Sequence, residues 1–240
     1  MTSSLPSKQP SSVGELLRRR LREVNRSRDE LAEVLEVPGA YLDDLISGAR
    51  RPPLPGRTDI YQKMTSFLRL GRNDLAACAH AERADATRGE APAPEPGVRR
   101  LLLELCEPGT AQVLERRRVR QGSAELAGFI QRLLDVTQGA VRRLLDDQIT
   151  LRLAAGARGT TYLELRLNVL EFLDATPDTL TTDDLTEFVQ PRIARWDVNL
   201  ETGVLWVALR GHEPRERGRG RAPGRRATGG SPAGDDGLGP

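Results

Sequence analysis

The chain has 240 residues, of which 38% are hydrophobic and 29% are charged, and its formal net charge at pH 7 is +2. This near balance excludes a surface that binds nucleic acid through an overall excess of basic residues. No apolar run approaches the ~20 residues that a membrane span requires, so we expect no membrane partner. The opening "MTSSLPSKQPSS" lacks the apolar stretch of a secretory signal, and we therefore expect a cytoplasmic protein.

Composition divides the chain into five segments. Residues 1–11 are polar and rich in Ser and Pro, which predicts a flexible lead. Residues 87–97 contain "RGEAPAPEPG" and are typical of a linker, so 12–86 and 98–210 become the two ordered regions. Residues 211–240 combine Gly, Pro and Arg with almost no apolar side chains, which predicts a disordered tail. The tail's arginines suit either non-specific contact with nucleic acid or solubility alone.

The first ordered region, residues 12–86, is predicted to be entirely helical. Its apolar residues recur at helical spacing in four stripes, and "DLAACAHAERA" supplies a fifth helix. The stripes are Val13, Leu16, Leu17, Leu21 and Val24; Leu31, Ala32 and Leu35; Leu42, Leu45 and Ile46; and Ile60, Met64, Phe67 and Leu68. Short helices with tight connections predict a compact five-helix domain with one shared core.

The second ordered region, residues 98–210, begins with helical stripes and then changes period. "ITLRL" (149–153) and "YLELRLNV" (162–169) alternate apolar and polar residues around the glycine-rich "AAGARGT". This pattern predicts a β-hairpin. "IARWDVN" and "VLWVALR", joined by "LETG", predict a second hairpin, and "TTDDLTEFV" between the hairpins predicts a short helix. The expected fold is α+β, with a five-helix domain, a helical segment and a small antiparallel-sheet domain.

The stretch "DELAEVLEVPGAYLDDLISGARRP" resembles the Cro and lambda-repressor-like family, also called Xre-like helix-turn-helix proteins. Its second helix carries Leu31 and Ala32, a turn leads to Val37, and the third helix holds Tyr41 and Leu42 before Gly48. A basic loop with a proline follows. The resemblance covers about a quarter of the chain with its flanking helices, and it implies double-stranded DNA as a partner, with the third helix in the major groove.

The resemblance assigns a DNA-contacting role to nine residues. They are Arg28, Pro38, Gly39, Ala40, Asp43, Asp44, Arg50, Arg51 and Arg57. Arginines at the start of the second helix and in the loop are expected to hold phosphates. The third helix departs from the family pattern, because Pro38 replaces a capping hydroxyl and two aspartates replace hydroxyl or basic residues. Aspartate accepts a hydrogen bond from the cytosine amine but repels phosphates.

A weaker second candidate lies in "ELAGFIQRLLDVTQGAVRRLLDD", residues 125–147. It repeats the Glu-Leu-Ala, Val and Gly-Ala of the first motif, and its reading helix would offer Thr137, Gln138, Arg142 and Arg143 to DNA. The alternative is one long amphipathic helix with Gly139 inside it, because the apolar residues of this stretch also fall on a single helical stripe.

The sequence predicts no catalytic residue, metal or cofactor, and therefore no enzyme. Cys78 and Cys106 lie far apart and outside any CxxC pair, which predicts small buried thiols rather than a zinc site. The leading hypothesis is an Xre-like DNA-binding transcriptional regulator whose region 98–210 forms a homodimer, binds a protein partner or senses a signal. The alternative is a protein-interaction adaptor that keeps a helix-turn-helix scaffold without reading DNA.

Overall fold

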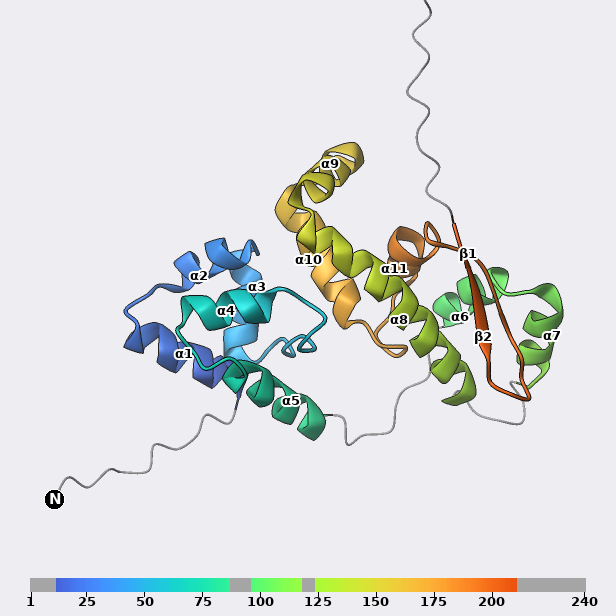
Figure 1. Cartoon of the computed structure of the whole chain (residues 1–240), viewed down its shortest axis with the longest axis horizontal. Coiled ribbons are helices and arrows are strands. Elements are labelled where there is room, and N and C mark those ends of the chain that lie inside the picture. Colours follow the sequence, from blue (N-terminus) through green and yellow to red (C-terminus); the bar gives the residue numbers. More distant parts are fainter. Residues whose placement is uncertain (1–11, 87–95, 118–123, 211–240) are drawn as a thin grey trace, which may run out of the picture. The chain divides into compact units, whose positions relative to one another are not determined.

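The computed structural model describes residues 12–86, 96–117 and 124–210, which are mostly helical (Figure 1). The helices of the first region are α1 (Val13–Glu23), α2 (Arg28–Leu35), α3 (Gly39–Ser47), α4 (Ile60–Phe67) and α5 (Asp74–Ala86). The elements of the second region are α6 (Pro96–Glu104), α7 (Pro108–Arg117), α8 (Ala124–Asp146), α9 (Gln148–Arg158), α10 (Tyr162–Asp174), α11 (Thr182–Asp184), the π-helical segment η1 (Leu185–Val189), β1 (Ile193–Val198) and β2 (Leu205–Leu209). Within the described ranges the strands form one two-stranded antiparallel sheet.

The apolar stripes predicted within residues 12–86 lie on α1 to α4, and α5 completes this group of helices. Most of their side chains are buried in one core, whereas Val24, Ile46 and Phe67 are partly buried. The largest fully enclosed side chains are Leu17, Leu31, Leu35, Leu42, Leu45, Ile60, Met64 and Leu68. Each such side chain contributes ~1.5–3 kcal/mol through burial, before the entropy of ordering it is subtracted. Packing between helices therefore stabilises elements that are too short to be stable alone.

The predicted hairpin at 149–169 is wrong, because these residues form α9 and α10. The Asp147 side chain accepts from the Thr150 amide and starts α9, and Gly159 ends α9 in the left-handed region at φ 70°. Thr161 and Glu164 then form a capping box that starts α10. Three local signals for helix ends thus outweigh two short stretches of alternating apolar and polar residues.

The second predicted hairpin is confirmed, as β1 and β2 pair antiparallel with Trp196 opposite Val207. Trp196 is 1% exposed, and its indole Nε1 donates to the Leu102 carbonyl at 2.8 Å, which ties the hairpin to α6. The predicted short helix before the hairpin is also present, because Thr181 and Asp184 form a capping box at α11.

Residues 118–123 and the predicted lead and tail, residues 1–11 and 211–240, lie outside the described residues. So does most of the predicted linker, although its last residues are helical, since α6 begins at Pro96. Proline suits a first helical turn, where its missing N–H leaves no hydrogen bond unmade. The described residues up to Arg210 form one compact unit, so the two regions pack against each other.

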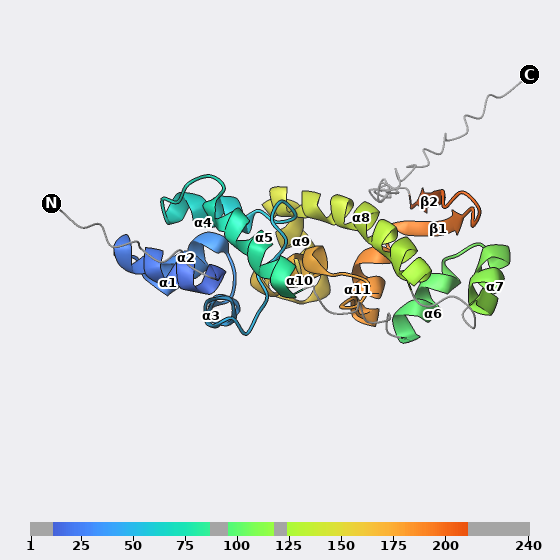
Figure 2. The same cartoon turned by 90° about the horizontal axis from the view of Figure 1, so that it is seen from below.

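α8 has 23 residues. Figures 1 and 2 both show it as one continuous helix. It packs along α10 and also contacts α9, η1 and β2. This single helix covers nearly all of the second candidate motif, which was expected at residues 125–147.

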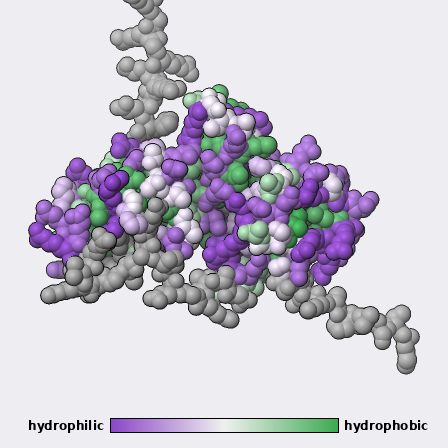
Figure 3. All heavy atoms as spheres, turned by 180° about the vertical axis from the view of Figure 1, so that it is seen from behind, coloured by the Kyte–Doolittle hydropathy of each residue, from purple (hydrophilic) through white to green (hydrophobic). Residues whose placement is uncertain are grey.

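The surface of the described residues is largely hydrophilic on the face shown in Figure 3, with smaller separate hydrophobic areas. The large apolar residues with the highest exposed fractions are Ile149 (73%), Leu153 (71%), Leu209 (59%) and Trp206 (54%). No helix within the described ranges has the length and apolarity needed to cross a membrane.

Gly14 of α1 lies against the backbone of α3 and gives a test of this packing. A Cβ at Gly14 would lie 2.3 Å from the Ile46 carbonyl oxygen, whereas a Cβ at Gly39 would meet nothing within 4 Å. We expect Gly14→Ala to lower the free energy of unfolding by ~1–3 kcal/mol through overpacking. Gly39→Ala should leave it unchanged or raise it slightly, because alanine favours helix. Equal thermal denaturation midpoints for the two variants would contradict the close approach.

Candidate functional site

The α2–turn–α3 unit is built by local signals in the sequence. Ser27 and Glu30 form a capping box that starts α2, and Glu36 ends it in the left-handed conformation at φ 55°. Val37, which is 4% exposed, anchors the turn in the core. Pro38 occupies the N-cap position of α3 with φ −57° and ψ 143°, so it precedes the first helical turn and offers no side-chain cap.

The outward side of α3 presents the residues that the sequence assigned to DNA bases. Gly39 and Ala40 are exposed in the first turn, and Asp43 and Asp44 are half-buried one turn further on. Gly48 closes the helix at φ 82°, where a residue with a Cβ would be strained. The outward side of the first turn of α3 is therefore accessible and carries only the small residues Gly39 and Ala40, while Tyr41 and Leu42 are buried.

Asp43 has a partner inside the same group of helices. Arg28, at the start of α2, donates from Nη1 to Asp43 Oδ1, and this ion pair connects α2 to α3. The charge of Asp43 and its hydrogen bond raise the pKa of Arg28 further above its usual value, with a smaller effect from Asp29. The arginine that was expected to hold a phosphate is thus neutralised by an aspartate from the expected reading helix.

Two loop arginines contact carboxylates of the second region. Arg50 forms an ion pair with Glu171 of α10 at 2.7 Å, and its guanidinium also lies 5.0 Å from the Tyr41 ring centroid. Arg57 donates to Asp135 at 2.9 Å and to Gln138 Oε1 at 2.5 Å, both on α8. The loop between α3 and α4 is therefore held against α8 and α10.

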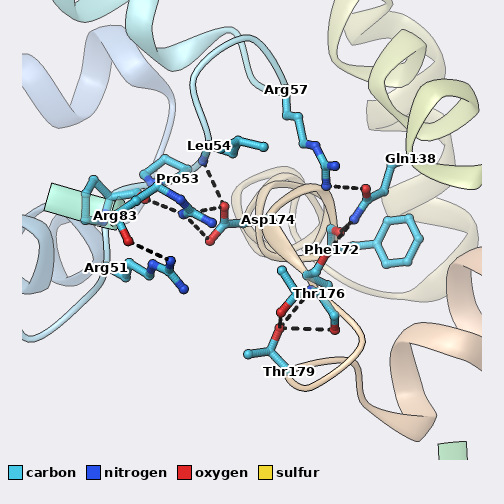
Figure 4. Close-up of polar contacts among 12 residues, drawn as sticks. Arg51, Pro53, Leu54, Arg57, Arg83, Gln138, Phe172, Asp174, Thr176 and Thr179 are labelled. Atoms are coloured by element: carbon cyan, nitrogen blue, oxygen red, sulfur yellow. Dashed lines mark hydrogen bonds and ion pairs between the residues drawn. The ribbon is translucent and has the colours of Figure 1, made fainter. Parts of the chain in front are cut away.

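Asp174, the last residue of α10, is the centre of a further set of contacts with the same loop (Figure 4). Its carboxylate accepts from Arg83 Nη1 at 2.8 and 3.1 Å and from the Leu54 amide at 2.8 Å. Arg83 is 7% exposed and also donates to the Pro52 carbonyl at 2.6 Å. Arg51 donates to the Arg83 carbonyl at 3.4 Å. One buried arginine and one carboxylate thereby fix the backbone of the loop.

Arg166 of α10 makes the most enclosed contact between the two regions. It is 0% exposed, and Nε and Nη2 donate to the Leu35 carbonyl at 3.1 and 3.0 Å. Nη2 also donates to both carboxylate oxygens of Asp59, at 2.9 and 2.7 Å. A buried cation requires such pairing, because removing an unpaired charge from water costs several kcal/mol. Arg166 thus joins the end of α2 and the start of α4 to α10.

A second set of charges continues this contact toward solvent. Lys63 lies 2.7 Å from Glu36 and 3.1 Å from Asp59, and Gln148 of α9 donates to both oxygens of Glu36 at 3.2 Å. Partial burial by itself would raise the pKa of Glu36, but the hydrogen bond and charge of Lys63 outweigh it and lower that pKa. Glu36 is therefore held ionised where α2 ends.

A cleft of about 370 Å³ opens beside these contacts, between the α3–α4 loop and the end of α10. Its walls carry Arg50 and Arg51 on one side and Glu171 and Asp174 on the other, together with threonine hydroxyls. Arg50 and Glu171 on its walls pair with each other, and Asp174 pairs with Arg83, so each of these two carboxylates already has a cationic partner.

The second candidate DNA-binding motif is wrong, because its turn is absent and α8 runs through it. Thr137 is 0% exposed and donates to the Leu133 and Leu134 carbonyls within α8. Gln138 is 3% exposed and donates to the Phe172 and Ala175 carbonyls at 2.8 and 2.9 Å. Arg142 and Arg143 are exposed, but they lie near the C-terminal end of α8 and not at the N-terminus of a reading helix. The alternative of one long helix is the observed structure.

Three important polar residues were missed by the sequence reasoning. Arg83 lies in an alanine-rich helix, Arg166 in an apolar stretch read as a strand, and Asp174 at a helix end. The available signal was Arg166, whose immediate neighbours Leu165 and Leu167 are apolar. An isolated charge on an apolar face indicates a buried partner, because an unpaired charge there would be costly.

Metal and thiol chemistry gain no support from the described residues. They contain no group of three or more His, Cys, Asp or Glu side chains placed to hold a metal ion. Cys106 is buried and Cys78 half-buried, and both are free thiols. Burial raises the pKa of Cys106 to about 12, so this thiol is protonated and unreactive at neutral pH.

No protein-family model matches the chain, and comparisons with curated proteins and with solved structures give no match either.

The Arg166 contact predicts a large difference between two arginine substitutions. Arg166→Met should lower the free energy of unfolding by about 3 kcal/mol, because it leaves the Leu35 carbonyl and Asp59 without their buried partner. Arg195→Met removes an ion pair with Glu107 whose side chains are 60% and 38% exposed, and it should cost less than ~1 kcal/mol. Urea denaturation of both variants measures the difference. Equal costs would show that Arg166 does not join the two regions.

Proposed function

We propose that the protein is a DNA-binding transcriptional regulator of the Xre-like type, with α2 and α3 as its helix-turn-helix within a five-helix domain. The observation that carries the proposal is the accessible first turn of α3, which follows a tight turn and is packed on α2. A short helix presented in this way can enter the major groove, which is ~12 Å wide.

Base contacts in this arrangement would come from a few small or acidic groups. Gly39 and Ala40 let the helix approach closely, and the Ala40 methyl suits contact with the thymine methyl. Asp44 suits acceptance from a cytosine amine, while Asp43 shares its carboxylate with Arg28. Such a surface specifies few base pairs, so sequence discrimination would be modest.

Phosphate contacts require the loop arginines to change partners. The Arg50–Glu171 and Arg57–Asp135 pairs are partly exposed to solvent. Pairs of this kind contribute ~0–1 kcal/mol each, so a phosphate can replace the carboxylate at little cost. The enclosed contacts of Arg83 and Arg166 are not open to such exchange, and DNA would therefore meet a protein whose two regions stay joined.

A second candidate function is favoured by the same ion pairs. Arg28, Arg50 and Arg57 each have an acidic partner within the chain. If these pairs persist, the α2–α3 surface has no free basic collar, and a protein-interaction adaptor with a helix-turn-helix scaffold fits better. The partner would then contact the small and acidic outer side of α3.

The DNA-binding proposal predicts a response to salt and to the loop arginines. Fluorescence anisotropy of the full chain with labelled duplexes should show an affinity that falls with log salt, by roughly 0.9 log units per phosphate contact. Arg50→Ala/Arg51→Ala should weaken binding uniformly across duplex sequences and make this slope shallower. Arg195→Ala, which removes an exposed arginine of β1, is the matched control and should bind as the parent does.

The acidic residues of α3 separate the two candidates. Asp43→Asn/Asp44→Asn removes two negative charges and frees Arg28, so non-specific DNA affinity should rise. Each lost repulsion is worth up to about 1 kcal/mol near the surface. An adaptor predicts no DNA binding at low salt by the parent or by this variant. That result would contradict the regulator and leave the adaptor.

A further inference from the structure

β2 is an edge strand whose outer side is open among the described residues. On the other side of the sheet, the segment between α6 and α7 covers β1, because Trp196 donates to the Leu105 carbonyl at 3.0 Å and its carbonyl accepts from the Glu107 amide at 2.9 Å. β2 has the β1 strand on one side. α8 also contacts β2, but within the described ranges no other segment makes a backbone hydrogen bond to Leu205, Val207 or Leu209.

The hydrogen-bonding direction along β2 follows from these contacts. Trp196 directs its N–H and C=O away from β2, so its partner Val207 directs its own groups away from β1. Val204 and Arg210 point inward, since their groups bond to Asn199 and Arg192. By alternation, Leu205, Val207 and Leu209 present their N–H and C=O groups along the outer edge.

The side chains of this edge lack the usual protection against pairing. The run "VLWVAL", residues 204–209, contains no charge and no proline. Val204 is 48%, Trp206 54% and Leu209 59% exposed. Natural edge strands are normally blunted by charges, prolines or covering segments. An uncharged apolar edge with a half-exposed tryptophan indicates a surface that is covered by another strand.

We propose that β2 pairs with β2 of a second copy of this chain, antiparallel about a two-fold axis at Val207, to form a four-stranded sheet. In this register Leu205 lies opposite Leu209 of the partner subunit, and Val207 lies opposite its own counterpart. The outward N–H and C=O groups of Leu205, Val207 and Leu209 then all bond to the β2 strand of the partner subunit. The edge is therefore complementary to itself. Such an interface is isologous and closes as a dimer.

The size and charge of the side chains on β2 support a second copy of this chain as the partner of its open edge. The same register places Trp206 opposite Ala208 of the partner subunit, so each large exposed ring meets a small residue. Because residues 204–209 carry no charge, the two-fold axis brings no like charges together. The proposal does not rest on DNA binding, since none of these residues belongs to α2, α3 or the loop.

Sedimentation velocity and light scattering of the full chain test the proposal. The parent should be a concentration-dependent dimer. Trp206→Lys places charges on the edge, and Val207→Pro removes an outward N–H that β1 does not use. Each should raise the dimer dissociation constant by about tenfold or more. Circular dichroism should show both variants folded, because Trp206 is exposed and the β1 ladder is retained.

Exchanging the large and small residues at positions 206 and 208 tests the proposed register of the two β2 strands. Ala208→Trp should weaken the dimer by crowding Trp206 of the partner subunit, and the double variant Trp206→Ala/Ala208→Trp should restore association. Leu153→Lys, at an equally exposed apolar residue of α9, is the matched control and should leave the dimer unchanged. A monomeric parent, dimers insensitive to the β2 variants, or dissociation by Leu153→Lys would each overturn the proposal.

Discussion

The buried guanidinium of Arg166 is the interaction on which the arrangement of the two regions depends. Its donors satisfy the Leu35 carbonyl, left unpaired where α2 ends, and the Asp59 carboxylate, which precedes α4. A side chain of α10 therefore bridges two helices of the first region. Because removing one partner of a buried ion pair costs several kcal/mol, this contact couples α10 to the end of α2 and the start of α4.

The loop between α3 and α4 is held by two kinds of contact, one enclosed and one exposed to solvent. Asp174 and Arg83 fix its backbone, while Arg50 and Arg57 contact Glu171 and Asp135 at the rim. The enclosed contacts hold the loop in place, and the exposed ones are weak enough to exchange. Under the proposed function, DNA binding would therefore require the exposed pairs of Arg50 and Arg57 to open while the enclosed contacts stay closed.

The sequence predicts those helices and strands that are set by the spacing of nearby residues. The helices of 12–86 follow apolar spacing, and the 193–210 hairpin follows alternation around a glycine turn. The prediction of a hairpin at residues 149–169 was wrong. Ile149 and Leu153 alternate with polar residues in the sequence, yet both lie on one exposed side of α9. The partners of the loop arginines could not be predicted, since Arg50 and Glu171 are 121 residues apart and only the fold brings them together.

The most direct test of this account is unfolding of the full chain followed by two probes. Both tryptophans, Trp196 and Trp206, lie in the hairpin of the second region, whereas far-ultraviolet circular dichroism reports helices of both regions. If Arg166 joins the regions into one cooperative unit, the fluorescence and dichroism transitions coincide in urea. A dichroism signal lost in two steps, with fluorescence following only one of them, would contradict the account.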